Sequence, residues 1–309
     1  MKRPEILQAS FNIVRFLAFK ICPIITLKIE FKRHAGYKLN LKKPKTFNEK
    51  LQWLKLYWYD SRAVICADKY SVRKYIESKG LGHILNDLYG VYDKVEDINF
   101  DTLPDKFIMK VNHGCGQNLV CTNKSQIEWD AEKKRFKKWL KTSHYFKSLE
   151  WVYRDIHPRI IVEKLIETKD GKPPKDFKIF CFNGEPKCLF VAKDRGEGTT
   201  KFDFYDLNWN PIPVKNYYPN SNKIMTKPKE LEDMIEYARI LSEGFPHMRV
   251  DFYLEDGKVI FGECTFFHFS GNKPFEPIDF DYKLGSYLKL PLKEQSDKQM
   301  KYNYNKMFG

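Results

Sequence analysis

The stretch MRVDFYLEDGKVIFGECTFF, residues 248 to 267, indicates how the carboxyl-terminal half of this chain folds. Strand-forming residues lie on both sides of EDGK, and a tight glycine turn between two such runs predicts a β-hairpin. Asp251 and Glu263 are about equally distant from the turn, so the hairpin brings both carboxylates together on one face. Arg249, two residues before Asp251, points to the same face.

Two acids that meet in a hairpin of this kind need a cation between them. Val250, Phe252 and Phe261 indicate that the hairpin is largely buried, and burial makes unpaired carboxylates costly. Mg²⁺ suits such a pair, because it takes hard oxygen ligands and shares them with substrate phosphates. The alternative is an exposed acid pair on an amphipathic hairpin.

A second candidate site lies in KFIMKVNHGCGQN, residues 106 to 118, where a strand ends in Lys110 and a glycine loop follows. Backbone N–H groups of such a loop can approach phosphate oxygens, because Gly114 and Gly116 have no Cβ in the way. An ordinary hairpin turn and a metal site are the alternatives. The metal site would use His113, Cys115 and Cys121.

Three further groups of charged residues are less specific. Glu163 and Lys164 stand at the end of the apolar strand IIVEKLI, and Lys69 and Arg73 have the spacing of one helix face. Lys178 interrupts an apolar strand, where a lysine is most often an edge residue or reaches to solvent.

The pattern of elements predicts an α+β fold with antiparallel sheets. Residues 1–100 read as mostly helical, with a capping box formed by Thr46 and Glu49 and a second amphipathic helix that Gly80 ends. Residues 101–292 read as the main domain, rich in strands, with helices at 130–142 and 228–243. Residues 293–309 read as a polar tail.

Bulk properties limit the classes of function. The 309 residues carry a net charge of +14, which favours anionic ligands, but the basic and aromatic residues are dispersed, and no nucleic-acid partner is expected. Seven cysteines without C-x-x-C spacing indicate a reducing, cytoplasmic compartment. The apolar segment 11–27 carries basic residues and Pro23, so a packed helix is expected, with peripheral contact to the inner membrane surface as the second interpretation.

Taken in order, these motifs resemble the ATP-grasp superfamily. The matching stretches are ADK (67–69), MKVNHGCGQN (109–118), VEKLI (162–166), MRVDF (248–252) and GECT (262–265). KTFNEKLQWLKL, DKYSVRKYI and DFKIFCFNGEP are similar to the TupA-like branch, which is associated with teichuronopeptide and other surface-polysaccharide biosynthesis. The likeness covers roughly residues 45–290.

The resemblance implies ATP and Mg²⁺ as cofactors and assigns roles to particular residues. Lys69, Lys110, Gly114 and Gly116 would contact the ATP phosphates. The adenine would lie against Glu163, Lys164 and Leu165, with a hinge between two subdomains near 163–168. Mg²⁺ would be held by Asp251, Glu263 and Thr265, although the superfamily usually has Asn at the last position. Arg249 would stabilise the charge of the reaction intermediate, and Lys178 would assist.

The activity implied is that of an ATP-grasp ligase, which joins a carboxylate to an amine through an acyl-phosphate. By the same resemblance, its partners are an acidic sugar or glycan and an amino acid or amine, in capsular or other surface-polysaccharide biosynthesis. The alternatives are a kinase of ATP-grasp type and a glycosyltransferase of the same pathway, for which DFD at 279–281 is the one D-x-D candidate. A shorter helical segment replaces the usual amino-terminal α/β domain.

Overall fold

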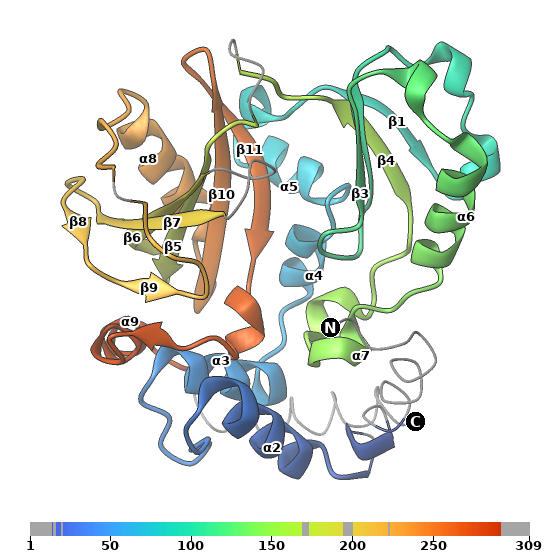
Figure 1. Cartoon of the computed structure of the whole chain (residues 1–309). Helices are drawn as coiled ribbons and strands as arrows, with labels where there is room; N and C mark the ends of the chain where they lie inside the picture. Colours follow the sequence, from blue (N-terminus) through green and yellow to red (C-terminus); the bar gives the residue numbers. More distant parts are fainter. Residues whose placement is uncertain are drawn as a thin grey trace.

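The computed structural model describes residues 14, 17–19, 21–168, 173–193, 200–221 and 223–291 (Figure 1). Helices gather in the amino-terminal third and recur between the strands. Their bounds are α2 Pro23–Ala35, α3 Phe47–Tyr57, α4 Ser61–Ala67, α5 Val72–Ser78, α6 Trp129–Leu140, α7 Tyr145–Ser148, α8 Leu231–Ser242 and α9 Asp279–Tyr287. No helix within these described residues is long and apolar enough to cross a membrane.

Two antiparallel sheets form the frame of the molecule. The small sheet has the strand order β1-β4-β2-β3, the large sheet β11-β10-β5-β6-β7-β8, and β12 pairs with β9 separately. The strands are β1 Leu88–Tyr92, β2 Phe107–Val111, β3 Asn118–Cys121, β4 Ile160–Lys164, β5 Asp176–Phe182, β6 Glu185–Lys193, β7 Lys201–Asp206, β8 Pro211–Ile212, β9 Lys215–Asn216, β10 His247–Glu255, β11 Lys258–Thr265 and β12 Phe275–Glu276.

The small sheet has a hydrophobic core of its own. Phe107, Met109 and Val111 alternate along β2 toward one face, where they pack with Val162 of β4 and Phe136 of α6. The alternation of buried and partly buried residues in FIMKV therefore indicates a strand that packs against the core through one face. Lys110 points to the other side.

The strand β1 was not predicted, because residues 1–100 were expected to be mostly helical. Leu88–Tyr92 pairs antiparallel with β4, with Tyr92 opposite Ile160 and Leu88 opposite Glu163. Its side chains are only partly buried, and it ends the sheet, so it lacks the apolar alternation that marks a strand in sequence. The small sheet thus draws one strand from the region expected to be helical.

The large sheet is covered differently on its two faces. Helix α8 packs against β5, β6 and β10 on one face, which carries Ile179 and Val250. The opposite face carries Phe180 and Phe182 and, further along the same strands, the charged side chains of the candidate site. Phe47 of α3 contacts both phenylalanine rings edge-on, with ring centroids 6.0 and 5.6 Å apart. The core of the large sheet therefore includes the amino-terminal helices.

The predicted capping box of α3 is confirmed. The Thr46 hydroxyl accepts from the Glu49 backbone N–H, and the Glu49 carboxylate accepts from the Thr46 N–H at 3.1 Å. The next prediction needs correction, because α5 begins only at Val72. Lys69 lies in the turn before the helix and not on one helical face with Arg73. In this turn the Lys69 backbone N–H donates to Asn112 of the loop after β2.

Candidate active site

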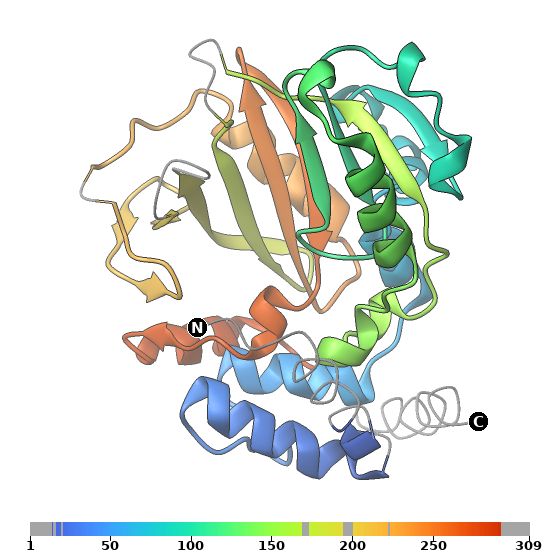
Figure 2. The same ribbon diagram turned by 45° about the vertical axis from the view of Figure 1, so that its right-hand side comes forward.

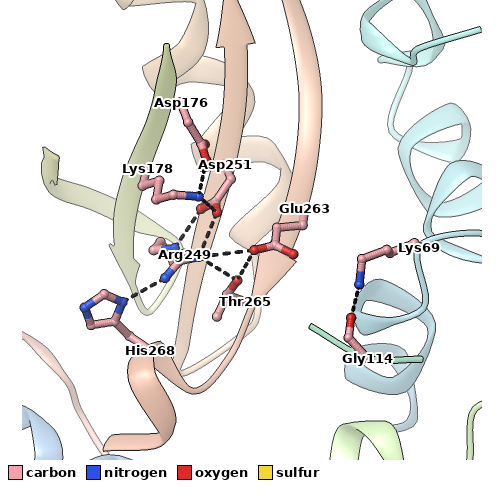
Figure 3. Close-up of polar contacts among 9 residues, drawn as sticks. All are labelled: Lys69, Gly114, Asp176, Lys178, Arg249, Asp251, Glu263, Thr265 and His268. Carbon is pink, nitrogen blue, oxygen red and sulfur yellow. Dashed lines mark hydrogen bonds and ion pairs between the residues drawn. The ribbon is translucent and has the colours of Figure 1, made fainter. Parts of the chain in front are cut away.

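The predicted β10–β11 hairpin is present, and a β-bulge between Asp251 and Phe252 shifts its register. Asp251 lies directly opposite Glu263, and Arg249 lies opposite Thr265. On the other side of β10, Asp251 faces Lys178 of β5. Paired residues of antiparallel strands point to the same face, so these five side chains gather on one side of the large sheet (Figure 3).

Arg249 is the centre of this cluster. Its Nε and Nη2 atoms each donate to one oxygen of Asp251 at 2.7 Å, which is a bidentate pair. Nη2 also lies 3.0 Å from the Thr265 hydroxyl and 3.3 Å from Glu263. Burial alone would lower the pKa of Arg249, but the charge of Asp251 and then that of Glu263 hold it above its ordinary value. The Arg249 guanidinium is therefore a positive charge that Asp251 holds in place beside Glu263 and Thr265.

Lys178 corrects the expectation for a lysine in an apolar strand. It lies on a central strand and is almost fully buried, with its ammonium in contact with Asp251 and 2.8 Å from Asp176. The ammonium thus holds two buried carboxylates of the same face. Since removing one member of such a group leaves a buried charge without its partner, Lys178 serves to fix Asp251 and, through it, Arg249.

His268 and Asn216 complete the support of Arg249. Nη1 of Arg249 donates to Nδ1 of His268 at 2.7 Å, and the histidine Nε2 lies 2.8 Å from Oδ1 of Asn216. Burial first, and then the charge of Arg249, lower the pKa of His268 well below its ordinary value. The imidazole is therefore neutral, and its contact with the Asn216 oxygen places the proton on Nε2.

The small sheet contributes a second set of charges. Lys110 of β2 and Glu163 of β4 point away from the core of this sheet, and their side chains meet with Nζ 2.6 Å from Oε2. Arg73 of α5 approaches the same carboxylate at 3.6 Å. Lys110 therefore already has an anionic neighbour on its own sheet, and a ligand phosphate would compete with Glu163 for it.

Lys69 connects the turn before α5 with the glycine loop. Its Nζ donates to the Gly114 carbonyl at 2.5 Å (Figure 3). Burial lowers the pKa of Lys69, while the charge of Glu263 raises it and that of Lys110 lowers it. Figure 3 shows Lys69 across from the β10–β11 hairpin, on the side of Glu263 away from Arg249. The structure thus brings the predicted phosphate-contacting lysines and the acidic hairpin to one region.

The loop after β2 is held by a residue that the motif did not reveal. Asn112 is fully buried, and its amide donates to Asp68 at 2.8 Å and to the His157 carbonyl at 2.9 Å. Gly116 has a φ of 70°, a left-handed conformation that favours glycine. The segment is also a true hairpin turn, because β2 pairs with β3. The glycine loop that follows Lys110 is therefore at the same time the turn of the β2–β3 hairpin.

The proposed metal site in this loop has no support. Cys121 donates to the Asp105 carbonyl at 3.4 Å, and His113 lies 3.1 Å from the Thr142 carbonyl. Within the part of the chain that the structure describes, no three His, Cys, Asp or Glu side chains gather as metal ligands. A metal at the acidic hairpin would therefore be held by fewer than three His, Cys, Asp or Glu side chains of the described residues, and its remaining ligands would be of other kinds.

Asp251, Glu263 and Thr265 offer oxygen donors of the kind that Mg²⁺ takes. Both oxygens of Asp251 already accept from Arg249 or Lys178, whereas the Glu263 side chain is 36% exposed. The donor set fits Mg²⁺ chemically, with Glu263 and Thr265 on the accessible side and Asp251 buried behind them. Additional ligands would come from water or substrate phosphates.

The expected adenine contacts remain a prediction. Glu163 ends a buried strand and is engaged by Lys110, while Lys164 is exposed and its backbone N–H donates to the Asp87 carbonyl. Beyond Leu165, the Glu167 N–H donates to Glu255 at the end of β10. The segment after β4 therefore runs from the small sheet to the large one, where the hinge was expected.

Asp176, Asn112, His268 and Asn216 are the site residues that sequence reasoning missed. Asp176 alone had a usable signal, since it lies two residues before Lys178 and shares its face. The other three form their contacts with residues distant in sequence, and nothing in the MKVNHGCGQN stretch singled out Asn112.

Comparisons with known proteins agree with this arrangement. The family model described as TupA-like ATPgrasp matches residues 49–289. No curated protein matches the sequence significantly.

Solved structures show a distant likeness. D-alanine–D-alanine ligase from Bacillus anthracis, complexed with ATP, has 16% identity and a TM-score of 0.43, covering 77% of this chain and 68% of its own. N5-carboxyaminoimidazole synthase from Aspergillus clavatus, in complex with ADP and a ribonucleotide, has 15% identity and a TM-score of 0.40, covering 76% of this chain and 54% of its own. D-alanine–D-alanine ligase from Helicobacter pylori has 14% identity and a TM-score of 0.42, covering 78% of this chain and 69% of its own. Likeness at this level concerns the fold and not the substrates.

The family match extends from α3 to the end of α9 and includes both sheets and all the clustered residues described above. The resemblance drawn from the motifs and the expected ATP-grasp fold are confirmed. The chain belongs to the TupA-like ATP-grasp family.

Proposed function

We propose that this ATP-grasp protein is an ATP- and Mg²⁺-dependent carboxylate–amine ligase that releases ADP and phosphate and forms an amide. The observation that carries the proposal is the placement of Arg249. Its buried guanidinium stands beside Glu263 on the large sheet, and Lys69 lies on the other side of that carboxylate, across from the hairpin (Figure 3). Positive charge on two sides suits a reaction in which phosphate and an oxyanion must both be stabilised.

In the first step, an oxygen of the substrate carboxylate attacks the γ-phosphorus of ATP. The bond from this phosphorus to the bridging oxygen breaks, ADP leaves with the electron pair, and an acyl-phosphate remains. Lys69, Lys110 and the loop with Gly114 and Gly116 bind the phosphates, and Glu163 to Leu165 lie against the adenine. Glu263 and Thr265, with Asp251 buried behind them, would hold Mg²⁺, which would neutralise phosphate charge when bound.

In the second step, the amine attacks the carbonyl carbon of the acyl-phosphate. The carbonyl oxygen becomes an oxyanion, which Arg249 stabilises. Phosphate then leaves with the electrons of the C–O bond, and the nitrogen gives up a proton to form the amide. Asp251 and Lys178 contribute by holding Arg249, because a charge already fixed in place costs no reorganisation when the oxyanion forms.

For the substrates we propose a uronic-acid-containing sugar and an amino acid or other amine. The resemblance to the surface-polysaccharide branch suggests this class, and a net charge of +14 is suited to acidic glycans. We propose that the protein acts in the cytoplasm, in the biosynthesis of capsular or related surface polysaccharides.

A glycosyltransferase is less well supported. Its one D-x-D candidate, at 279–281, lies in the first turn of α9. There the Asp281 carboxylate accepts from the Asn48 backbone N–H at 3.0 Å, from the Asn48 amide at 2.9 Å and from the Tyr37 hydroxyl at 2.9 Å. These contacts tie α9 to α3 and leave Asp281 little capacity for a metal. A kinase that stops after phosphoryl transfer keeps the same site.

Product analysis tests the proposal. The full chain is incubated with ATP, Mg²⁺ and a panel of uronic acids and amines, and products are identified by mass spectrometry. ADP, phosphate and an amide are expected only when acid and amine are both present. A stable phosphorylated sugar with no amide would identify a kinase, and transfer of sugar from a nucleotide sugar without ATP consumption would rule out the ligase.

A further inference from the structure

The amino-terminal helices carry aliphatic side chains that remain exposed among the residues that the structure describes. Helix α2 packs inward through Leu27, Phe31 and Ala35. On the outer side, five aliphatic side chains have 46 to 75% of their surface exposed, and we call them the N-terminal apolar face. They are Val14, Leu17, Ile21, Ile25 and Ile29. Exposed single aliphatic residues are common, but a run at helical spacing marks an interaction surface.

Basic residues surround this face, and acidic ones are absent from it. In the segment from 14 to 45 the only acid is Glu30, which is buried and pairs with Arg33 at 3.2 Å. The exposed bases of the same segment are Lys28, Lys32, Arg33, Lys38, Lys42, Lys43 and Lys45. An apolar stripe flanked by lysines is the pattern of a helix that lies in the plane of a membrane surface.

The position of α2 leaves this face accessible. In Figure 1 and Figure 2, α2 lies at the outer end of the molecule, with α3 between it and the large sheet. A flat surface could therefore approach α2 without entering the region of Arg249 and Lys69. The helix is 13 residues long, too short to span a bilayer.

We propose that the N-terminal apolar face docks on the surface of an anionic phospholipid bilayer. The aliphatic side chains would enter the boundary between headgroups and acyl chains, and the flanking lysines would contact anionic headgroups. This inference does not depend on the ligase activity, because none of its residues belongs to the candidate active site.

A second copy of this chain fits the face less well. An interface between copies would bring together two segments whose described residues expose seven lysines and arginines and no acid, and like charges across an interface oppose association. An anionic bilayer offers the opposite charge to every one of these bases.

Vesicle sedimentation of the full chain tests the proposal. The probes are vesicles of phosphatidylcholine alone and vesicles with equal parts of phosphatidylglycerol and phosphatidylcholine. The test variant is Ile25→Ser with Ile29→Ser. The matched control is Ile65→Ser with Ile224→Ser, which removes two isoleucines that are 44 and 82% exposed elsewhere on the surface. Far-ultraviolet circular dichroism verifies that both variants fold.

We expect the wild type and the control to bind the anionic vesicles, and the test variant to bind them at least about tenfold more weakly. Lys28→Gln with Lys32→Gln should also weaken binding, by about fivefold for each lysine, and added salt should weaken it further. Equal losses in test and control variants, or no binding to anionic vesicles, would overturn the proposal. A dimer in size-exclusion chromatography that the test variant abolishes, without vesicle binding, would overturn it in favour of self-association.

Discussion

The two sheets carry their charges in different ways. On the large sheet, the side chains of Asp176, Lys178 and Asp251 are 5% exposed or less and are paired with one another. On the small sheet, Lys110 is 19% exposed and its one described ion-pair partner is Glu163. In the first group all the charges are buried, whereas in the second Glu163 is buried and Lys110 is partly exposed next to a loop. We infer that the charges of the large sheet are fixed before the ligand binds. On the small sheet, Lys110 would leave Glu163 to contact the ligand phosphate.

Removal of Lys178 should have the largest effect on stability. Lys178→Met leaves Asp176 and Asp251 buried without their shared ammonium, which should lower the free energy of unfolding by about 3–5 kcal/mol. Urea denaturation measures the loss. The control is Lys187→Met on the neighbouring strand β6, an exposed lysine whose change should stay within about 0.5 kcal/mol. Similar losses in both variants would contradict the distinction between buried and surface charges.

Lys110→Ala and Glu263→Ala should act on activity instead. Each should lower ATP turnover by at least about a hundredfold, because each removes a charge that faces the phosphates. In Glu263→Ala, the free energy of unfolding should change by less than about 1 kcal/mol, since this side chain is 36% exposed. In Lys110→Ala, the buried Glu163 carboxylate keeps Arg73 at 3.6 Å, so the loss of stability should stay below that of Lys178→Met. The control is Lys106→Ala, which removes an exposed ion pair to Glu167 beside β2.

Turnover is measured as ADP release, and folding as the urea midpoint. Unimpaired turnover in both variants would refute the assignment of the site. Unfolding of Lys110→Ala would show that the small sheet depends on its charges as the large sheet does.

Stability should depend on pH through the core that the large sheet shares with α3 and α9. Burial raises the pKa of Asp281 to about 6. A raised folded-state pKa favours the protonated form, so this contribution is full below about pH 4 and is lost as pH rises through about 6. The shift of about two units corresponds to about 3 kcal/mol.

The measurement is the free energy of unfolding from pH 4 to 7 in the wild type and in Asp281→Asn. The variant cannot ionise at this position, so its curve should fall less steeply over that window. Parallel curves would mean that Asp281 does not titrate there.

The smallest effect is expected from His268, which acts through Arg249. His268→Leu removes the acceptor at 2.7 Å, so kcat should fall about tenfold while the KM for ATP stays nearly constant. In His268→Asn, the side-chain oxygen stands near the former Nδ1 and should restore most of kcat. Equal loss of kcat in the two variants would reduce His268 to a packing role.

Local patterns accounted for much of the fold. The β10–β11 hairpin, the capping box of α3 and the strands β2 to β7 were predictable, because turns, caps and alternation depend on residues close in sequence. The strand β1 was missed, since its residues are only partly buried and show no alternation. The start of α5 was misplaced because the apolar spacing of the segment continues backward through the turn that holds Lys69.

For the site, the sequence by itself determined the β10–β11 hairpin and the shared face of Arg249 and Asp251, which are two residues apart on one strand. Glu263 lies opposite Asp251 only because of a β-bulge between Asp251 and Phe252, which the sequence pattern did not predict. The sequence also placed Lys110 before a glycine loop. Only the tertiary structure decided that Lys178 joins two buried acids, that His268 and Asn216 support Arg249, and that Lys69 lies across from the acidic hairpin. The physical reason is distance along the chain, since these contacts form only when strands and loops from separate parts of the sequence pack together.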